Sequence, residues 1–406
     1  MNKNIPYFAT VIIAIFLLYI GHITAVDGLF ILQDDQNETV RARVLTIVER
    51  SERTASDFEF FDDFGFFDDS DFFDSFDDEE FDFSHFLYVP GTTIIFEARV
   101  TRGIRRGEII TAEQSFNPFL PDRSKEIARG DNILLVNNNF GWFFGGYVRT
   151  NGLIGLGVLF IFCLLFFGRK KGFNTILSLA FTCASIFAVF VPAILSGKNI
   201  YLMAILVCIY TIAMTLLIVI GYNKKSLAAV AGCTGGVIVA AIIALIMDRV
   251  LNLTGLVDEH SRHLIHLPGD VQLNLNALIF AGIIIGAMGA IMDVAISISS
   301  SLWEIKENAK IIKLKELFRS GMNIGRDIMG SMANTLILAY IGSSLTVVLL
   351  LAVYSGSFLN LFNSEMIAVE ILQALAGSLG ILFAMPLTAF FCSVLFLKDK
   401  SDFAKR

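Results

Sequence analysis

Two long apolar segments of this 406-residue chain carry charged and amide side chains that lipid disfavours. Leu275–Ser299 contains Asp293 in an otherwise uncharged run, and the next segment carries Arg326, Asp327 and Asn334 at its start. An ionisable side chain at the centre of a membrane helix costs roughly 2.5–3.5 kcal/mol on insertion scales, so it persists mainly where it faces protein, water or a bound group. Function is therefore expected in these two segments.

Helical periodicity gathers these residues into two stripes. On a helix with 3.6 residues per turn, the face of Asp293 also carries two glycines and two serines: Gly286, Gly289, Ser297 and Ser300. The following segment repeats the pattern with Asp327, Gly330, Ser331 and Asn334. Small residues let helices approach closely, and serine, amide and carboxylate groups can bond across the contact. We expect the two stripes to face each other or a shared cavity.

Two interpretations of these stripes remain open. In the structural one, Asp293 bonds to serine or asparagine on a neighbouring helix, and Arg326 and Asp327 form an interfacial ion pair at a helix start, where the dipole favours aspartate. In the functional one, the carboxylate binds a cation or a proton, or orients a polar substrate. Asp293 is expected near one end of its span, where a charge costs less.

Composition defines the class of protein. With 55% hydrophobic residues and a mean hydropathy of +0.68, the chain is predicted to be an α-helical polytopic membrane protein. The net charge of -7 becomes +6 when the thirteen acids of Asp57–Phe86 are set aside, because -7 + 13 = +6. A basic remainder suits a protein among anionic lipids.

About eight membrane spans are predicted. They are Pro6–Val26, Asn151–Gly168, Phe173–Leu195, Ile200–Tyr222, Leu227–Met247, Leu275–Ser299, Asp327–Val353 and Val369–Leu397. The first, within residues 1–26, is interpreted as an uncleaved signal anchor, because no clear small-x-small cleavage site follows Ile20. Basic loops lie on one side of the remaining spans, so the positive-inside rule predicts a multi-pass protein of a bacterial cell membrane with both termini cytoplasmic, including the tail 398–406.

Residues 27–150 form the sizeable portion outside the predicted spans. Five short runs of alternating or β-branched residues predict strands: Val40–Val48, Thr92–Thr101, Glu108–Gln114, Asn132–Val136 and Trp142–Val148. Turn signals such as Arg102-Gly103 and Arg129-Gly130-Asp131 separate them. We expect a small extracytoplasmic all-β domain with a barrel-like or OB-like topology, followed by a membrane domain over 151–397.

An insertion of unusual composition interrupts this β domain. Asp57–Phe86 interleaves thirteen acidic residues with twelve phenylalanines and keeps neither a strand period nor a helix period. A solvated, disordered loop is the interpretation that composition favours. Diffuse binding of divalent cations, or contact of the phenylalanines with a partner or a lipid surface, are the alternatives.

Metal and catalytic motifs are mostly absent from the sequence. All five cysteines fall inside predicted spans, and His260, His263 and His266 recur every three residues, a spacing that drifts round a helix face. There is no phosphate-binding loop, HExxH or GxSxG motif. We predict no cofactor, no metal site and no enzyme, although Asp293 and Asp327 could in principle act as an acid–base pair.

The segment Glu304–Arg319 alternates apolar and basic residues between the two polar spans. Ile305, Ala309, Ile312 and Leu317 are opposed by lysines and Arg319. The pattern predicts an amphipathic helix on the inner leaflet, with gating or partner docking as the alternative role.

Residues in the two polar segments carry a family resemblance. GAMGAIMDVAISISSSLWEI and LFRSGMNIGRDIMGSMANTLILAYIGSSL resemble the YibE/F-like family of bacterial multi-span membrane proteins, and a looser likeness extends from about Val40 to Leu397. Members are usually described as permeases, so the resemblance implies a permease with an anchor, a small outer domain and seven further spans. The motif positions that it implies are Asp293, Ser297, Glu304, Arg319, Ser320, Gly321, Asn323, Gly325, Arg326, Asp327, Gly330, Asn334, Thr335 and Tyr340.

The sequence as a whole predicts a permease that moves an ion or a small polar solute. Its pathway is expected along the polar faces of the sixth and seventh spans, lined by Asp293, Ser297, Ser300, Arg326, Asp327, Ser331, Asn334, Thr335 and Tyr340, with Gly286, Gly289 and Gly330 as packing residues. The expected partners are the lipid bilayer, the unidentified solute and no nucleic acid, and a homo-oligomer or membrane partner is left open. The alternative is a non-transporting scaffold whose outer domain recruits a partner.

Overall fold

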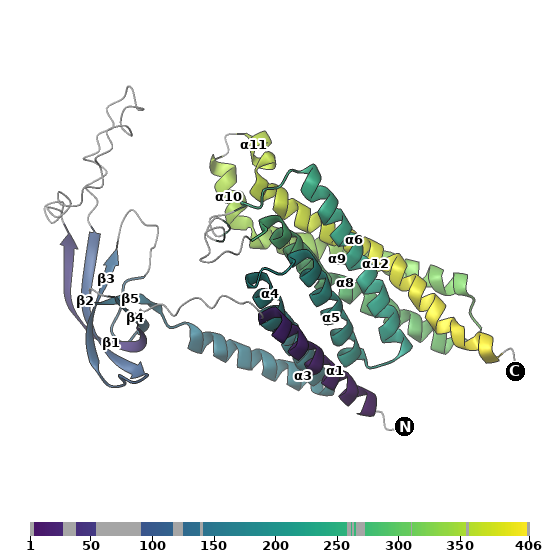
Figure 1. Cartoon of the computed structure of the whole chain (residues 1–406), viewed down its shortest axis with the longest axis horizontal. Coiled ribbons are helices and arrows are strands. Elements are labelled where there is room, and N and C mark those ends of the chain that lie inside the picture. Colours follow the sequence, from purple (N-terminus) through teal and green to yellow (C-terminus); the bar gives the residue numbers. More distant parts are fainter. Residues whose placement is uncertain are drawn as a thin grey trace. The chain divides into compact units, whose positions relative to one another are not determined.

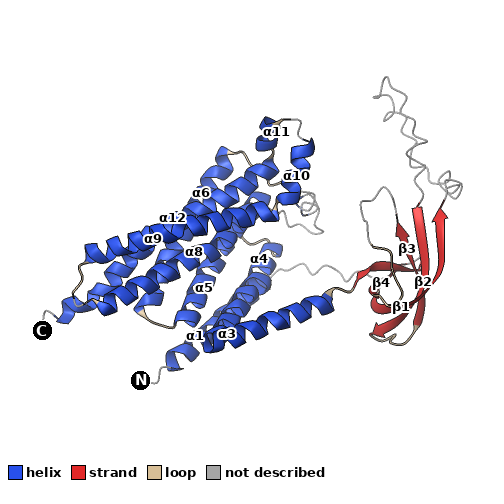
Figure 2. Ribbon diagram, turned by 180° about the vertical axis from the view of Figure 1, so that it is seen from behind, coloured by secondary structure: helices blue, strands red, loops and turns tan. Residues whose placement is uncertain are grey.

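A computed structural model of the chain describes residues 4–26, 38–53, 91–116, 125–138, 141–257, 261, 264, 273–309, 311–354 and 357–403. Two compact units emerge: Gln33–Phe160 is one, and Met1–Leu32 with Ile161–Arg406 is the other. The first contains the strands and the second is helical (Figures 1 and 2). The insertion Asp57–Phe86 and the three histidines of the loop before Leu275 lie outside the described residues.

Five strands close into the small barrel that the sequence predicts. They are β1 (Thr39–Arg53), β2 (Gly91–Arg102), β3 (Ile109–Phe116), β4 (Asn132–Asn138) and β5 (Gly141–Tyr147). The order around the barrel is β1-β2-β3-β5-β4, and β3 meets β5 in parallel while the other pairs are antiparallel. Alternate residues point inward, so Phe96, Ile133 and Leu135 are fully buried.

The segment before β4 is tied to β5 by hydrogen bonds. The Tyr147 hydroxyl lies 2.8 Å from the carbonyl oxygen of Lys125 and 3.1 Å from that of Glu126. Partial burial, with a smaller effect of the Asp131 carboxylate, raises the pKa of the Tyr147 hydroxyl above its usual value. The neutral, donating hydroxyl is thereby favoured.

The helical unit is built on long apolar helices. They are α1 (Asn4–Val26), α3 (Thr150–Ala184) with the π-helical turn η3 (Ser185–Phe190) and α4 (Val191–Leu195), α5 (Ile200–Ile220), α6 (Lys224–Val250), α8 (Leu275–Asn308), α9 (Leu314–Ser343), α10 (Leu345–Tyr354), α11 (Phe358–Asn363) and α12 (Glu365–Phe403). α3 begins in the β unit and continues into the helical one.

By length and composition, six helical stretches in the described part of the chain could cross a membrane, and a seventh is added if α9 and α10, bent by 61°, form one span. Eight were predicted. The count differs at Thr150–Leu195, which is one stretch by length and composition but consists of two helices that meet at a kink, in agreement with the two apolar segments expected there. It is interrupted at Arg169, whose φ of 48° lies in the left-handed region, between the two apolar runs.

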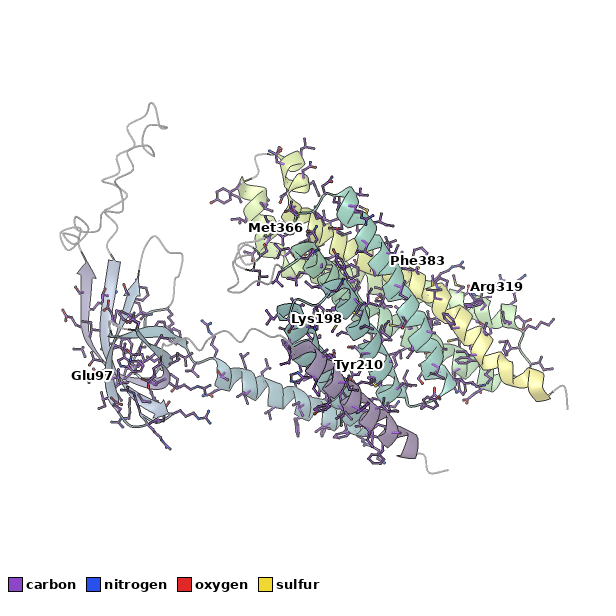
Figure 3. The ribbon with its side chains drawn as sticks, in the orientation of Figure 1. Glu97, Lys198, Tyr210, Arg319, Met366 and Phe383 are labelled. Atoms are coloured by element: carbon purple, nitrogen blue, oxygen red, sulfur yellow. The ribbon has the colours of Figure 1, made fainter. Side chains whose placement is uncertain are left out.

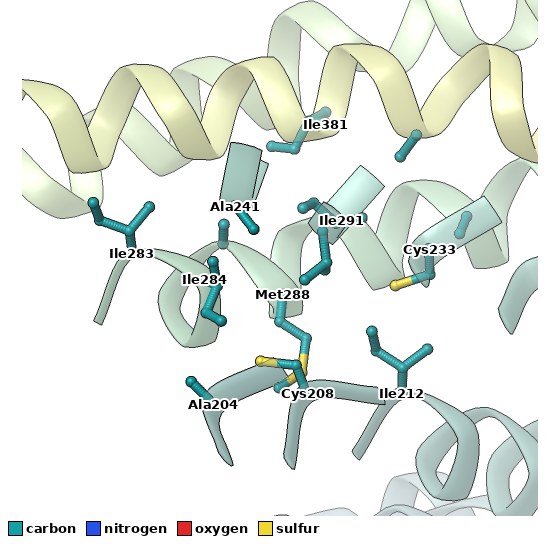
Figure 4. Packing of buried hydrophobic residues seen from close by; sticks show 14 of the residues in the cluster. Ala204, Cys208, Ile212, Cys233, Ala241, Ile283, Ile284, Met288, Ile291 and Ile381 are labelled. Atoms are coloured by element: carbon teal, nitrogen blue, oxygen red, sulfur yellow. The ribbon is translucent and has the colours of Figure 1, made fainter. Parts of the chain in front are cut away.

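α12 packs against α6, α8 and α9, and small residues bring these helices close together. A β-carbon on Gly236 of α6 would lie 2.6 Å from Ala384 Cβ and 2.9 Å from the Gly380 carbonyl oxygen of α12. Ile283, Ile284, Met288 and Ile291 of α8 fill the space between α5, α6 and α12 (Figure 4). The buried core is therefore centred on α8 and α12.

α1 packs on α5 and on the segment around η3. The Tyr210 hydroxyl of α5 donates to the Ala14 carbonyl oxygen at 3.1 Å (Figure 3). The Ser196 hydroxyl donates to the Ala25 carbonyl oxygen at 2.5 Å, and His22 Nδ1 lies 2.6 Å from the Ala188 carbonyl oxygen. Polar contacts along its length join α1 to the helical unit.

The prediction of one amphipathic helix over Glu304–Arg319 is wrong. α8 continues to Asn308 and α9 starts at Leu314, so the segment is divided between two helices and a break. The apolar side chains of Ile305 and Leu317 pack on the core of the helical unit. These apolar side chains are therefore covered by the protein itself and do not lie on the inner leaflet as predicted.

The five cysteines differ from one another in their burial. Cys208, Cys233 and Cys392 are buried, whereas Cys163 is half-buried and Cys183 is exposed on the surface of the chain. A cysteine that lies in an apolar helix is therefore not always buried by the rest of the chain.

Candidate functional site

One face of α8 is exposed and carries no apolar side chain. Between Leu275 and Leu302, the exposed residues of α8 are Gly282, Gly286, Gly289 and Asp293. Ser297 and Ser300 continue the same face and are half-buried. The predicted stripe is therefore present, extended by Gly282 at one end. Asp293 lies near the middle of the 34-residue helix α8, whose last turns, from Ser300 to Asn308, extend beyond the predicted span Leu275–Ser299.

α9 presents its polar residues on its outer face. Arg326, Asp327, Ser331, Asn334 and Thr335 are all exposed, and the Thr335 hydroxyl donates to the Ser331 carbonyl oxygen at 2.8 Å. The opposite face is buried and packs on α8 and α12. The sequence thus predicts correctly which residues share a face of this helix.

Arg326 and Asp327 occupy a different position from the one predicted. α9 begins at Leu314, so both residues lie more than three turns inside the helix and not at its start. The stabilising effect of a helix dipole on aspartate fades beyond the first turn and does not act on Asp327. Among the described residues, neither side chain takes part in an ion pair, so the expected Arg326–Asp327 pair is not formed.

The two stripes do not pack directly against each other. Within the described chain, Asp293 makes no hydrogen bond to Ser331, Asn334 or Asp327. A β-carbon on Gly289 or on Gly330 would meet no atom within 4 Å, so these glycines border open space where close helix packing was expected. The faces of α8 and α9 instead border the outside of the single chain.

Tyr340 joins α8 to α9 at one end of the α8 stripe. A β-carbon on Gly286 would lie 2.5 Å from the Tyr340 hydroxyl oxygen, so the glycine makes room for the phenol. This hydroxyl oxygen is buried and has no hydrogen-bond partner among the described residues. A buried polar atom without a partner costs free energy, so it is commonly paired with water or a bound group.

Two polar residues of α12 complete this end of the stripe, and the sequence did not single them out. The Glu370 carboxylate is close enough to influence Tyr340 electrostatically, and Gln373 Nε2 lies 4.0 Å from the position of a β-carbon on Gly282. Both side chains are half-buried. An acid and an amide three residues apart inside the last predicted span were the available signal, but only the packing of α12 brings Glu370 toward Tyr340 and Gln373 toward Gly282.

The arrangement offers oxygen ligands and hydrogen-bonding groups along an exposed polar face. Asp293 and Glu370 supply carboxylates, and Ser297, Tyr340 and Gln373 supply hydroxyl and amide groups. Within the described ranges, no three histidine, cysteine, aspartate or glutamate side chains are grouped so that they could hold a metal ion. Such a face can pass or loosely bind a hydrated ion or a polar molecule, since hard cations prefer oxygen ligands.

Other motif positions implied by the resemblance have a packing role. Gly321 and Gly325 of α9 are buried: a β-carbon on Gly321 would lie 2.8 Å from Ala389 Cβ, and Gly325 contacts Met385. Both residues bring α9 against α12. Glu304, Arg319 and Asn323 are exposed, and Ser320 is half-buried.

Comparison with known proteins supports the resemblance. The family model described as YibE/F-like protein matches residues 156–398, which is more than half of the chain and includes the α8 and α9 stripes. The match starts within α3, so the barrel lies outside it, although the looser likeness was expected from about Val40. Neither a curated protein nor a solved structure matches the chain. The matched residues establish that the chain belongs to the YibE/F-like family.

Proposed function

We propose that the protein is a permease whose pathway follows the exposed polar face of α8. The observation that carries this proposal is the absence of any exposed apolar side chain between Leu275 and Leu302. By contrast, α3 exposes Leu159, Phe162 and Phe166, as expected for contact with lipid. The stretch of α8 from Leu275 to Leu302 exposes only glycines and one aspartate, so this stretch is suited to contact with water.

The length of the face matches the thickness of a membrane. From Gly282 to Ser300, 18 steps of 1.5 Å along the helix axis give about 27 Å, against about 30 Å for a hydrocarbon core. Asp293, near the middle of α8, then lies at a depth where an ion or proton would need a counter-charge. Tyr340, Glu370 and Gln373 would line one end of this route.

The transported species is an ion or a small polar solute in this proposal. Arg326, Asp327, Ser331, Asn334 and Thr335 on α9 form a second polar wall, completed by water, a second copy or a membrane partner. The protein would lie in a bacterial cell membrane with both termini cytoplasmic and the barrel outside, according to the distribution of basic loops.

Access of water to the polar faces tests the proposal without knowledge of the substrate. In a variant lacking the five native cysteines, single cysteines replace Ser297, Ser300, Ser331 or Asn334, and the controls replace Leu159 of α3 and Phe383 of α12. The two control side chains are 56% and 48% exposed, so they are more exposed than the half-buried Ser297 and Ser300 and differ from all four positions in being apolar. Intact cells and inverted vesicles are then labelled with a membrane-impermeant thiol reagent.

We expect labelling at the four polar positions and none at Leu159 or Phe383. Complete protection of all six cysteines in folded protein would contradict the permease, because a route for ions must contain water. Labelling of the controls as strongly as the polar positions would show that the reagent does not report a pathway.

A scaffold without transport is the second candidate. The observation that favours it is the set of small or polar residues on α9, Gly330, Ser331 and Asn334, which are exposed and suit close packing by another helix. Under this alternative the barrel recruits a partner and the stripes serve assembly. Protection of Ser331→Cys and Asn334→Cys, together with a co-purifying membrane partner, would support it.

A further inference from the structure

A basic groove lies at the end of the barrel where β5 leads into α3. It has a volume of about 360 Å³ and is lined by residues of β1, β2, the start of β4 and the first turn of α3: Arg41, Ala42, Thr101, Arg102, Asn132, Val148 and Asn151. All belong to the unit Gln33–Phe160, so the groove is formed within one unit. The proposed permease pathway makes no use of it.

Two arginines face each other in this groove. Arg41 of β1 and Arg102 of β2 are directly opposite in the antiparallel register. The ion pairs of the barrel involve other arginines, Arg50 with Glu126 and Arg105 with Glu38 and Glu108, and neither Arg41 nor Arg102 has an acidic partner in the described part of the chain. Like charges directly opposite each other destabilise a sheet, so a bound anion would relieve the repulsion between these two arginines.

The backbone around the two arginines is irregular and well anchored. The register shifts from Arg41 opposite Arg102 to Ala42 opposite Val100, which leaves Thr101 as the extra residue of a β-bulge. The Thr101 hydroxyl donates to the Arg41 carbonyl oxygen at 3.1 Å. Bulges redirect side chains at barrel rims, and here one directs two cations to the same groove.

The neighbouring helix sets the depth of the groove relative to a membrane. α3 starts at Thr150, and Asn151–Gly168 contains no charged residue and no buried side chain. These 18 residues span about 27 Å at 1.5 Å per residue, close to the hydrocarbon thickness of about 30 Å. Asn151, at the start of this run, lines the groove, so a bilayer crossed by these residues would have its head groups at the level of the groove.

We propose that this groove binds the phosphate of an anionic phospholipid. Guanidinium groups bind phosphate oxygens in pairs, and Arg41 and Arg102 converge from adjacent strands to do so. The first N–H groups of a helix also favour a phosphate, and the first turn of α3 borders the groove. The bound lipid neutralises the arginine pair and holds the barrel at the membrane surface.

The test uses the purified full-length chain in detergent with phosphatidylglycerol or phosphatidylcholine added. Lipid retention is measured by native mass spectrometry, and the midpoint of thermal unfolding is measured in parallel. The variant R41Q/R102Q is compared with R99Q/R106Q, which removes the same charge from exposed arginines of the barrel outside the groove. Inorganic phosphate and glycerol phosphate are tested separately to distinguish a soluble anion from a lipid.

We expect wild type and R99Q/R106Q to retain phosphatidylglycerol in preference to phosphatidylcholine. R41Q/R102Q should bind it roughly tenfold or more weakly, since each cation near the surface contributes about a fivefold factor. Equal retention by the two double variants overturns the proposal. If inorganic phosphate alone raises the midpoint of thermal unfolding as much as the lipid does, the assignment to a lipid is overturned and the ligand is a soluble phosphate.

Discussion

At the scale of the residue, the proposed function depends most on Asp293. This residue is the exposed carboxylate of a face that otherwise carries glycine, and it lies near the middle of α8. No hydrogen bond ties this carboxylate to a neighbour in the described ranges, so it is available to a solute. The structural interpretation, in which a serine or asparagine side chain bonds to Asp293, finds no such partner among the residues that the structure describes.

Replacement of Asp293 by asparagine tests this role directly. Asp293→Asn keeps the shape and removes the charge, so we expect unchanged expression and thermal stability, and flux of protons or alkali cations reduced at least tenfold. Fluorescent reporters in proteoliposomes measure the flux, with Asp131→Asn in the barrel as a charge-matched control. Flux equal to that of wild type in Asp293→Asn would remove the carboxylate from the mechanism.

At the scale of the element, the close crossing of α6 and α12 holds the bundle together. Gly236 lets the two backbones approach, because a β-carbon there would meet Ala384 Cβ at 2.6 Å and the Gly380 carbonyl oxygen at 2.9 Å. Backbone and alanine atoms cannot move aside as a flexible side chain can. The crossing therefore tolerates no larger residue without a shift of a helix.

Gly236→Ala should lower the free energy of unfolding by about 1–3 kcal/mol, the usual cost of overpacking. Gly289→Ala is the matched control, since a β-carbon there meets nothing within 4 Å and alanine favours a helix by up to about 1 kcal/mol. Thermal unfolding in detergent compares the two variants. A control that loses as much stability as Gly236→Ala would argue against the crossing as the cause.

Much of this element-level organisation follows from the sequence. Short alternating or β-branched runs between turn signals predicted all five strands, and the 3.6-residue period predicted the faces that carry Asp293 and Asn334. Hydropathy measures the apolar length of a segment and not the length of its helix, so the start of α9 at Leu314 was missed and Asp327 was taken for a helix start. Glu370 and Gln373 were missed because only tertiary packing brings α12 beside Tyr340.

At the scale of the whole molecule, the barrel and the helical unit are separate in composition and packing. The barrel has its own core, built from Phe96, Ile133, Leu135 and their neighbours, and the family match covers the helices but not the strands. If transport takes place along α8 and α9, the transport activity should not depend on the insertion in the barrel. If the protein is a scaffold that binds a partner through the barrel, partner binding should depend on that insertion.

Deletion of Asp57–Phe86 separates these two expectations. For a permease, the deletion should leave membrane insertion and flux within about twofold of wild type, and it should remove thirteen acidic residues without harm to the α8 face. Flux in proteoliposomes and labelling of the polar cysteines provide the measurements. Loss of both on deletion, with the chain still folded, would favour recruitment through the outer domain.

The pairing of Arg53 with Gly91 closes the β1–β2 hairpin before the insertion begins. The cost of closing a loop grows only logarithmically with its length, by about 0.6 kcal/mol for each doubling. The segment between Arg53 and Gly91 can therefore change in length at little cost to the stability of the barrel. The same position suits an epitope or a fluorescent protein, which would report from the living cell on which side of the membrane the barrel lies.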